Sequence, residues 1–129
     1  MRFSLMLLAA TVNGLAALTA GAASAASVEV KDAVARVTVI PENRTDVKVE
    51  FIATNPKLPL KLRTFGGRTI VDGDLDRKIR NCRGSGERAS VDVRDVGSIA
   101  YAEMPQVVIH TPRDVRIETG GAVFGDLEP

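Results

Sequence analysis

Apolar and polar residues alternate along most of the chain after residue 26, with the period of two that is typical of half-buried β-strands. Residues 28–39 place Val and Ala on one face against charged residues and Thr on the other. The alternation resumes over residues 46–51, and the segment at residues 41–44 has the composition of a turn. We therefore predict a β-hairpin over residues 28–51.

Shorter apolar runs bounded by Gly or Pro predict further strands, which lie at residues 60–62, 68–72, 90–94 and 106–110. Residues 73–89 carry three Gly and many charges, which predicts a flexible surface loop. Residues 114–127 pass through Gly120 and Gly121 and fit either another hairpin or one rung of a β-solenoid.

No stripe of ten or more residues with helical period follows residue 26. The sequence therefore predicts an all-β fold, in which short antiparallel strands and hairpins lead into a β-solenoid-like or sandwich arrangement. A single β-rich domain is expected over residues 27–129, preceded by an N-terminal signal helix.

Residues 1–26 have the pattern of a secretory signal peptide. Arg2 supplies a positive charge, residues 5–18 are mostly apolar, and the small residues at 23–26 allow cleavage after Ala25 or after Ala26. A membrane-spanning helix needs about 20 apolar residues, and polar residues interrupt this shorter run. We predict cleavage, no stable membrane anchor, and export to the periplasm or the cell surface.

Charge and composition narrow the classes of partner. The 17 Lys and Arg include Arg2, so the chain without its leader balances 16 basic against 16 acidic residues. That balance argues against nucleic acid as a partner, because phosphate binding relies on a clustered excess of cations. The chain has no Trp and few aromatic residues, so a core of Val, Ile, Leu and Ala is expected, which suits packed strands.

Cys82 is the only cysteine. In an exported protein an unpaired thiol indicates an intermolecular disulfide, a partner residue outside this chain, or a free thiol without a role. Lys78, Arg80 and Arg83 would lower the pKa of the thiol and favour the thiolate. His110 is the only histidine and ends a predicted strand. A catalytic pair would require the fold to bring the two side chains together, and an ordinary structural role is the simpler interpretation of each.

The segment at residues 72–88 combines carboxylates with cations. Asp72, Asp74 and Asp76 alternate as the ligands of a calcium loop do, but the sequence has arginine where that loop needs Gly and Glu. Guanidinium groups bind anionic polysaccharides well, and the segment offers the basic residues Arg77, Lys78, Arg80, Arg83 and Arg88. A solvated, self-neutralising loop is the preferred interpretation, with no metal site and no cofactor.

Three segments together resemble the N-terminal part of bacterial exported proteins related to the auto-transporter adhesin head, or GIN, domain. These segments are residues 28–51, 79–82 and 104–125. The last is the most specific, because TPRDV at residues 111–115 before a Gly-rich strand is similar to the entry into that family's β-solenoid. The resemblance implies stacked rungs rich in Gly, Ser and Asp, and it implies no catalytic residues.

The family pattern continues through further rungs where this chain stops at Pro129, which implies a truncated product or a different closure of the fold. A single rung cannot bury its apolar face alone. We therefore expect the C-terminal edge near Ile117 and Val123 to be unpaired and to favour self-association.

These features predict a non-enzymatic exported β-scaffold that meets an unknown envelope or surface partner, with adhesion as the role that the resemblance implies. Two alternatives remain open at the level of the sequence. One is a small periplasmic hydrolase or thiol enzyme that uses Cys82. The other is a glycan- or calcium-binding module that uses residues 72–88.

Overall fold

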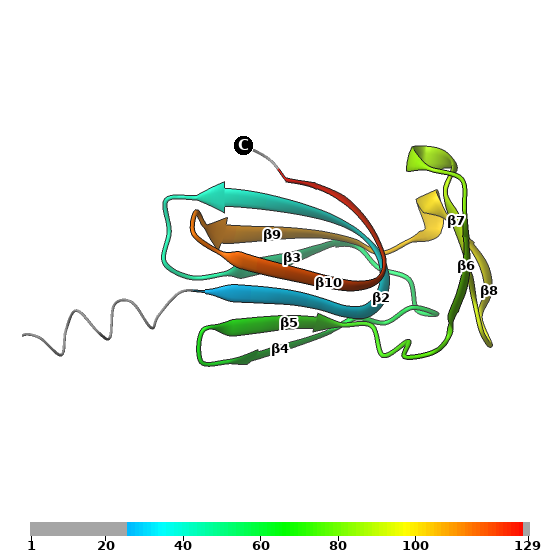
Figure 1. Cartoon of the computed structure of the whole chain (residues 1–129), viewed down its shortest axis with the longest axis horizontal. Helices are drawn as coiled ribbons and strands as arrows, with labels where there is room; N and C mark the ends of the chain where they lie inside the picture. The colour runs from blue at the N-terminus through cyan, green and yellow to red at the C-terminus, as the bar shows by residue number, and fades with distance from the viewer. Residues whose placement is uncertain (1–25, 128–129) are drawn as a thin grey trace, which may run out of the picture.

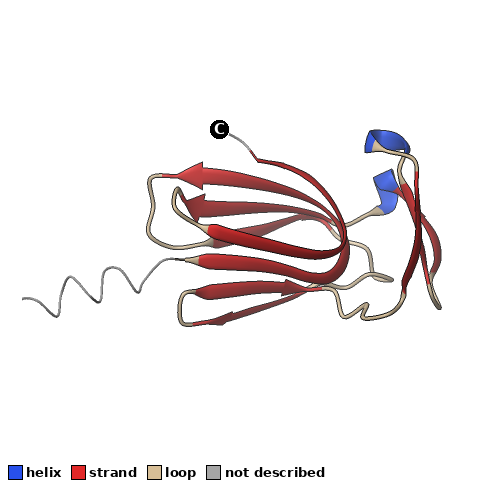
Figure 2. Cartoon of the chain, viewed as in Figure 1, coloured by secondary structure: helices blue, strands red, loops and turns tan. Residues whose placement is uncertain are grey.

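The computed structural model describes residues 26–127, and this part of the chain is almost entirely β-structure (Figure 2). The strands are β2 (Ser27–Glu42), β3 (Lys48–Ala53), β4 (Lys61–Phe65), β5 (Arg68–Asp72), β6 (Ile79–Arg83), β7 (Ser90–Val93), β8 (Gly97–Ala100), β9 (Gln106–Pro112) and β10 (Arg116–Leu127). Two single-turn 3₁₀ helices, η1 (Gly86–Arg88) and η2 (Tyr101–Glu103), lie beside them. The all-β prediction is confirmed, whereas the predicted signal helix lies outside the described residues.

Six strands form one curled, mixed sheet centred on β2. Along one edge of β2, β10 pairs in parallel over nearly its whole length. Along the other edge, the start of β2 pairs in parallel with β5 and its end pairs in parallel with β9. The antiparallel strands β4 and β3 then flank β5 and β9. The sheet therefore consists of strands stacked on β2, most of them parallel to it.

β2 and β10 bend together, and Figure 1 shows both strands running to one side of the molecule, turning there and running back. In β2 the inward residues change from even to odd positions between Val30 and Ala33. Asp32 adopts a positive φ of 47° at this point, and the pairing with β10 shifts between Thr119 and Gly121. A bulge of this kind bends a strand, so it accounts for the turn.

Residues without bulky side chains allow the backbones to stack closely at the bend. A Cβ on Gly73, which follows β5, would lie 2.6 Å from both the Ala33 Cα and the Asp32 carbonyl oxygen. A Cβ on Gly121 of β10 would lie 2.4 Å from the Ala33 carbonyl oxygen. Three segments thus approach one another here through their backbones, and this approach requires glycine on both sides of β2.

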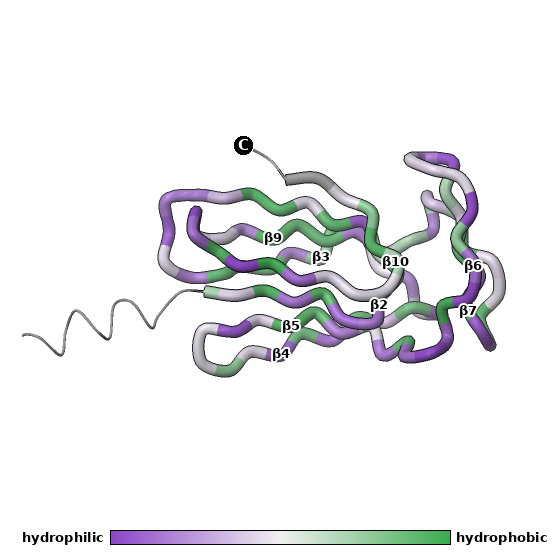
Figure 3. The backbone as a smooth tube through the Cα atoms, in the orientation of Figure 1, coloured by the Kyte–Doolittle hydropathy of each residue, from purple (hydrophilic) through white to green (hydrophobic). Residues whose placement is uncertain are grey.

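Two apolar cores lie on the two sides of the bend. The first fills the space between the returning arms, and its buried members are Val28, Val30, Ala33, Ala35, Val37, Val39, Val71, Val107 and Ile109. The second lies outside the bend, where the antiparallel sheet β6–β7–β8 covers it; its members include Val34, Val91, Val93, Ile99 and Ala122. Figure 3 shows apolar stretches along β2 and β9 and polar residues at the outer loops.

The predicted β-hairpin over residues 28–51 is wrong. β3 does not pair with β2, because β9 lies between them and hydrogen-bonds to both. Both predicted strands exist, but alternation of side chains specifies a face and not a neighbour. The predicted strands at residues 60–62 and 68–72 do form an antiparallel pair, β4 with β5.

The predicted loop over residues 73–89 is wrong in its central part. β6 occupies Ile79–Arg83 and pairs antiparallel with β7. Only Ile79 of β6 is partly buried, because the strand shows its polar face to solvent. Its composition therefore resembles that of a loop.

Residues 114–127 contain one continuous strand and not a hairpin. β10 runs through Gly120 and Gly121 and pairs in parallel with β2. The hairpin alternative for this segment is therefore wrong.

We expect Gly73→Ala to destabilise the protein by about 2 kcal/mol, because the new methyl group would meet backbone atoms that cannot give way. Gly120→Ala is the matched control, since its nearest atom would be 3.9 Å away, and a change of less than about 0.5 kcal/mol is expected. Urea unfolding followed by circular dichroism measures both. Equal losses in the two variants would contradict the close approach at the bend.

Candidate functional site

Cys82 and His110 do not form a pair in the structure. Cys82 is an exposed free thiol on β6 of the small antiparallel sheet. His110 lies on β9 of the curled sheet, and both of its ring nitrogens are engaged by carboxylates. Beside the thiol, the Arg83 guanidinium forms two hydrogen bonds of 2.8 Å to Asp92, so its charge is compensated there. A base poised to activate the thiol is not found among residues 26–127.

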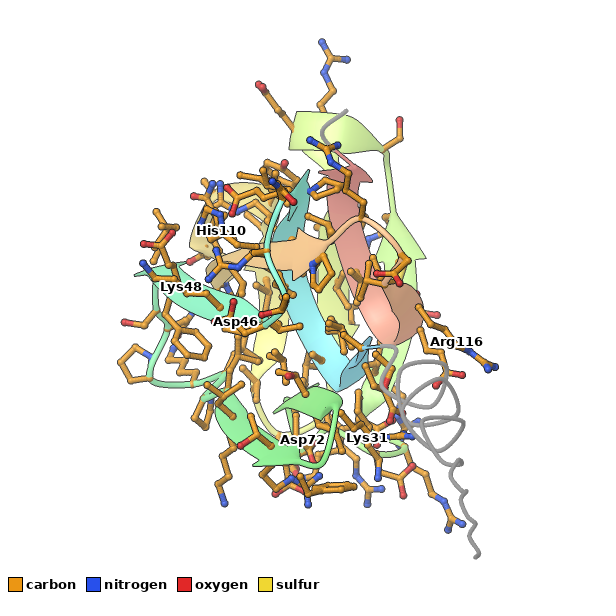
Figure 4. The ribbon with its side chains drawn as sticks, turned by 90° about the vertical axis from the view of Figure 1, so that its left-hand side faces the viewer. Lys31, Asp46, Lys48, Asp72, His110 and Arg116 are labelled. Atoms are coloured by element: carbon orange, nitrogen blue, oxygen red, sulfur yellow. The ribbon has the colours of Figure 1, made fainter. Side chains whose placement is uncertain are left out.

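His110 instead joins two strands through charged groups. Its Nδ1 lies 2.9 Å from Glu42 Oε2 at the end of β2, and its Nε2 lies 2.6 Å from Glu50 Oε1 on β3. Arg44 extends the cluster, because it donates to Glu42 at 2.8 Å and to Asp46 at 3.0 Å. Figure 4 shows His110 on the same side of the molecule as Asp46, away from Asp72. The cluster thus ties β2, β3 and β9 together at one end of the arms.

The groups in this cluster shift one another's pKa values. Hydrogen bonds to Glu50 and then Glu42 raise the pKa of His110 above its usual 6.5. The hydrogen bond from His110 lowers the pKa of Glu50 and, together with that from Arg44, the pKa of Glu42 below the usual 4.5. Both ring nitrogens can donate to carboxylates only when the imidazole is protonated, which explains the direction of each shift.

The acidic residues of the segment at residues 72–88 do not gather into a group that could hold a metal ion. Asp72 accepts hydrogen bonds from Arg63 at 2.7 Å and from the Asp74 backbone at 2.8 Å. Within the described part of the chain, no group of three or more His, Cys, Asp or Glu side chains is arranged to hold a metal ion. Arg77, Lys78, Arg80 and Arg88 are exposed.

The most distinctive surfaces are the two ends of the curled sheet. At one end the outer edge of β10 has no partner strand among the described residues. A groove of about 270 Å³ opens there between the arms, lined mainly by apolar side chains that include Val37, Ile109 and Val123. Ile117 on β10 is 36% exposed at its rim. The groove therefore reaches the edge of the first core, whose lining members Val37 and Ile109 are themselves buried.

The opposite end is formed by the edge strands β3 and β4, which carry exposed apolar side chains, namely Phe51, Ile52, Leu62 and Phe65. A groove of about 340 Å³ lies beside them, lined by Phe51, Leu58 and several prolines. Of these four side chains only Phe51 lines the groove. Contiguous exposed apolar surface marks interaction sites more often than single side chains do.

The sequence predicted one of these ends and missed the other. The sequence predicts an unpaired edge near Ile117 and Val123, and within residues 26–127 β10 is an edge strand. The sequence predicts a hairpin over residues 28–51 and a short strand at residues 60–62, and it does not predict that β3 and β4 are edge strands. A signal was present, because Phe51 is followed directly by Ile52 and the two must point to opposite faces of one strand.

No protein-family model, curated protein or solved structure matches this chain. The resemblance to GIN-related proteins stays a prediction. Across residues 26–127, helices long and apolar enough to cross a membrane are not found.

The His110 cluster predicts a pH-dependent stability. Because the folded-state pKa of His110 is raised, its contribution is complete below the unfolded value of about 6.5 and is lost as pH rises through the folded value. Glu42 and Glu50 also stabilise the fold, but their contributions depend on pH in the opposite direction and are lost as pH falls below about 4.5. Between these limits the cluster stabilises the fold most.

We expect the melting temperature to fall as pH rises above about 6.5, and His110→Gln to reduce that fall. The amide keeps hydrogen-bonding capacity but does not titrate. Scanning calorimetry at several pH values measures both proteins. A parallel decline in the two would show that other groups cause the pH dependence.

Proposed function

We propose that this chain is an exported, non-enzymatic β-scaffold of the periplasm or cell surface that acts by binding a partner in the envelope, with adhesion as the role suggested by the resemblance to GIN-related proteins. The observation that carries the proposal is the distribution of side chains. The candidate chemical groups Cys82 and His110 lie on separate sheets, whereas the two ends of the curled sheet expose strand edges and apolar side chains.

The architecture supports the same proposal. β2, β10 and the pair β5 and β9 form three parallel layers with a common bend. About three stacked repeats are needed for a solenoid to bury its core. We infer that these layers are rungs of a short β-solenoid. The small sheet β6–β8 is then an insertion at the bend of the rung that consists of β5 and β9. Elongated scaffolds of this kind present long surfaces to partners.

Export is supported by the leader, and the contacts of Ala26 favour one of the two cleavage positions. Ala26 is only 8% exposed, and its carbonyl oxygen accepts the Arg116 backbone N–H at 3.1 Å. Ser27 donates its backbone N–H to Gly67 at 3.0 Å. Cleavage after Ala25 keeps all of these interactions. Cleavage after Ala26 removes the buried methyl group and the acceptor for Arg116, and turns the Ser27 amide into a charged amine.

Expression in a Gram-negative host tests the export. We expect the protein in the periplasmic or surface fraction, with an intact mass that begins at Ala26. A cytoplasmic β-galactosidase marker controls for lysis. Retention of the full-length mass in the cytoplasm would contradict the proposal, and a mass that begins at Ser27 would contradict only the cleavage position.

The reactivity of Cys82 separates the scaffold from the thiol enzyme. Because Arg83 is paired with Asp92 and His110 with two glutamates, we expect iodoacetamide to label Cys82 near neutral pH at a rate within about threefold of glutathione. Mass spectrometry of the labelled chain gives the rate, and Cys82→Ser is the blank. Labelling ten or more times faster than glutathione would favour the enzyme.

A further inference from the structure

The outer edge of β10 differs from the edge at the other end of the curled sheet. β10 is a strand of 12 residues, whereas β3 and β4 have six and five. Proline and lysine protect exposed edges from pairing. Pro56 and Pro59 lie between β3 and β4, which begin at Lys48 and Lys61. β10 contains neither residue type, and among residues 26–127 no strand pairs with its outer edge, so this edge can accept another strand.

The groove beside β10 adds an apolar surface to this edge. It continues the first core, since Val37 and Ile109 line it together with Ile117 and Val123 of β10. A strand that pairs with β10 and bends with it would place its own inward side chains over this groove. Burial of apolar area would then accompany the backbone hydrogen bonds.

We propose that this end binds a second copy of the chain, with the two β10 strands antiparallel and the two-fold axis at Gly121. The proposal rests on the scaffold function above and names the partner of one of its surfaces. Gly121 lies in the bend, where its φ is +105°. An axis at this residue places the first arm of one copy against the second arm of the other, so that both bends coincide.

Side-chain sizes fit this register. Antiparallel pairing around Gly121 sets Ile117 opposite Gly125 and Thr119 opposite Val123, and all four residues line the groove. Inward residues therefore face inward residues in both copies, as a shared core requires. The exposed Ile117 of each copy meets a glycine of the other, which leaves room for its side chain over the groove.

The area that this end can bury indicates which size class of interface the contact belongs to. The 12 residues of β10 span about 40 Å in all, so each of its two arms is about 20 Å long, and the arms are about 10 Å apart. Covering both arms and the groove between them buries on the order of 500 Å² on each copy. The total of about 1,000 Å² is near the lower limit for a specific interface. The structure therefore fits a reversible dimer that dissociates on dilution.

Sedimentation velocity of the purified chain over a wide concentration range tests the dimer. We expect a monomer–dimer equilibrium, which Ile117→Lys weakens about tenfold or more because it replaces an apolar side chain that packs over the groove of the other copy with a charged one. Leu62→Lys is the matched control, since Leu62 is an exposed aliphatic residue on the edge strand β4, and it should leave the equilibrium unchanged. Circular dichroism confirms that each variant is folded.

Each other result overturns the proposal. A monomer at every concentration shows that this end takes no second copy. Weakening by Leu62→Lys alone assigns the contact to the opposite end of the sheet. Weakening by both variants indicates head-to-tail stacking, which has no two-fold axis.

Disulfide crosslinking tests the register. In the Cys82→Ser background, Thr119→Cys and Val123→Cys place thiols on opposite copies within the about 5 Å expected for facing Cβ atoms. Added diamide, which takes up the two electrons and two protons released, should join the two variants in a mixture. Each variant alone should form little dimer. Crosslinking of either variant with itself, and not with the other, would overturn the register.

Failure here is distinguishable from failure of the proposed function. An exported protein that stays monomeric refutes only the second copy as partner. A dimeric protein that is retained in the cytoplasm refutes only the exported scaffold.

Discussion

The close backbone contact at the bend of β2 is the constraint on which the rest of the fold depends. Ala33 stands between Gly73 on one side and Gly121 on the other, at distances that leave no room for a Cβ on either glycine. This contact makes the neighbouring layers turn at the same place. The arms can then enclose one core, and the outer side of the bend can carry the small antiparallel sheet over a second core.

The strands were predictable from the sequence to a larger extent than their partners. Alternation identified most of β2, β3 and β7, because the period of two is a local property, and an apolar run between two prolines identified β9. It could not show that β9 lies between β2 and β3. The bend did leave a local trace, since the apolar positions of β2 change parity between Val30 and Ala33. β6 was missed because nearly all its side chains face solvent.

The same distinction applies to the candidate sites. The sequence identified His110 and Cys82 as unusual, but the carboxylates that engage His110 lie 68 and 60 residues away along the chain. Only the tertiary fold joins them, so the histidine serves to connect strands. The edge position of β10 among the described residues follows from the strand order, and the alternation of side chains does not specify it. The apolar end at β3 and β4 required the strand order to be known.

The position of β2 at the start of the domain has a consequence for how the chain reaches its native state. Its parallel partner β10 lies about 90 residues further along the chain, and β5 and β9 also pair with it across long intervals. Closing such large loops makes folding slow. The edge of β2 that pairs with β10 therefore stays open until residues at the far end of the described segment reach it, so the strand that organises the sheet is among the last to have both of its neighbours.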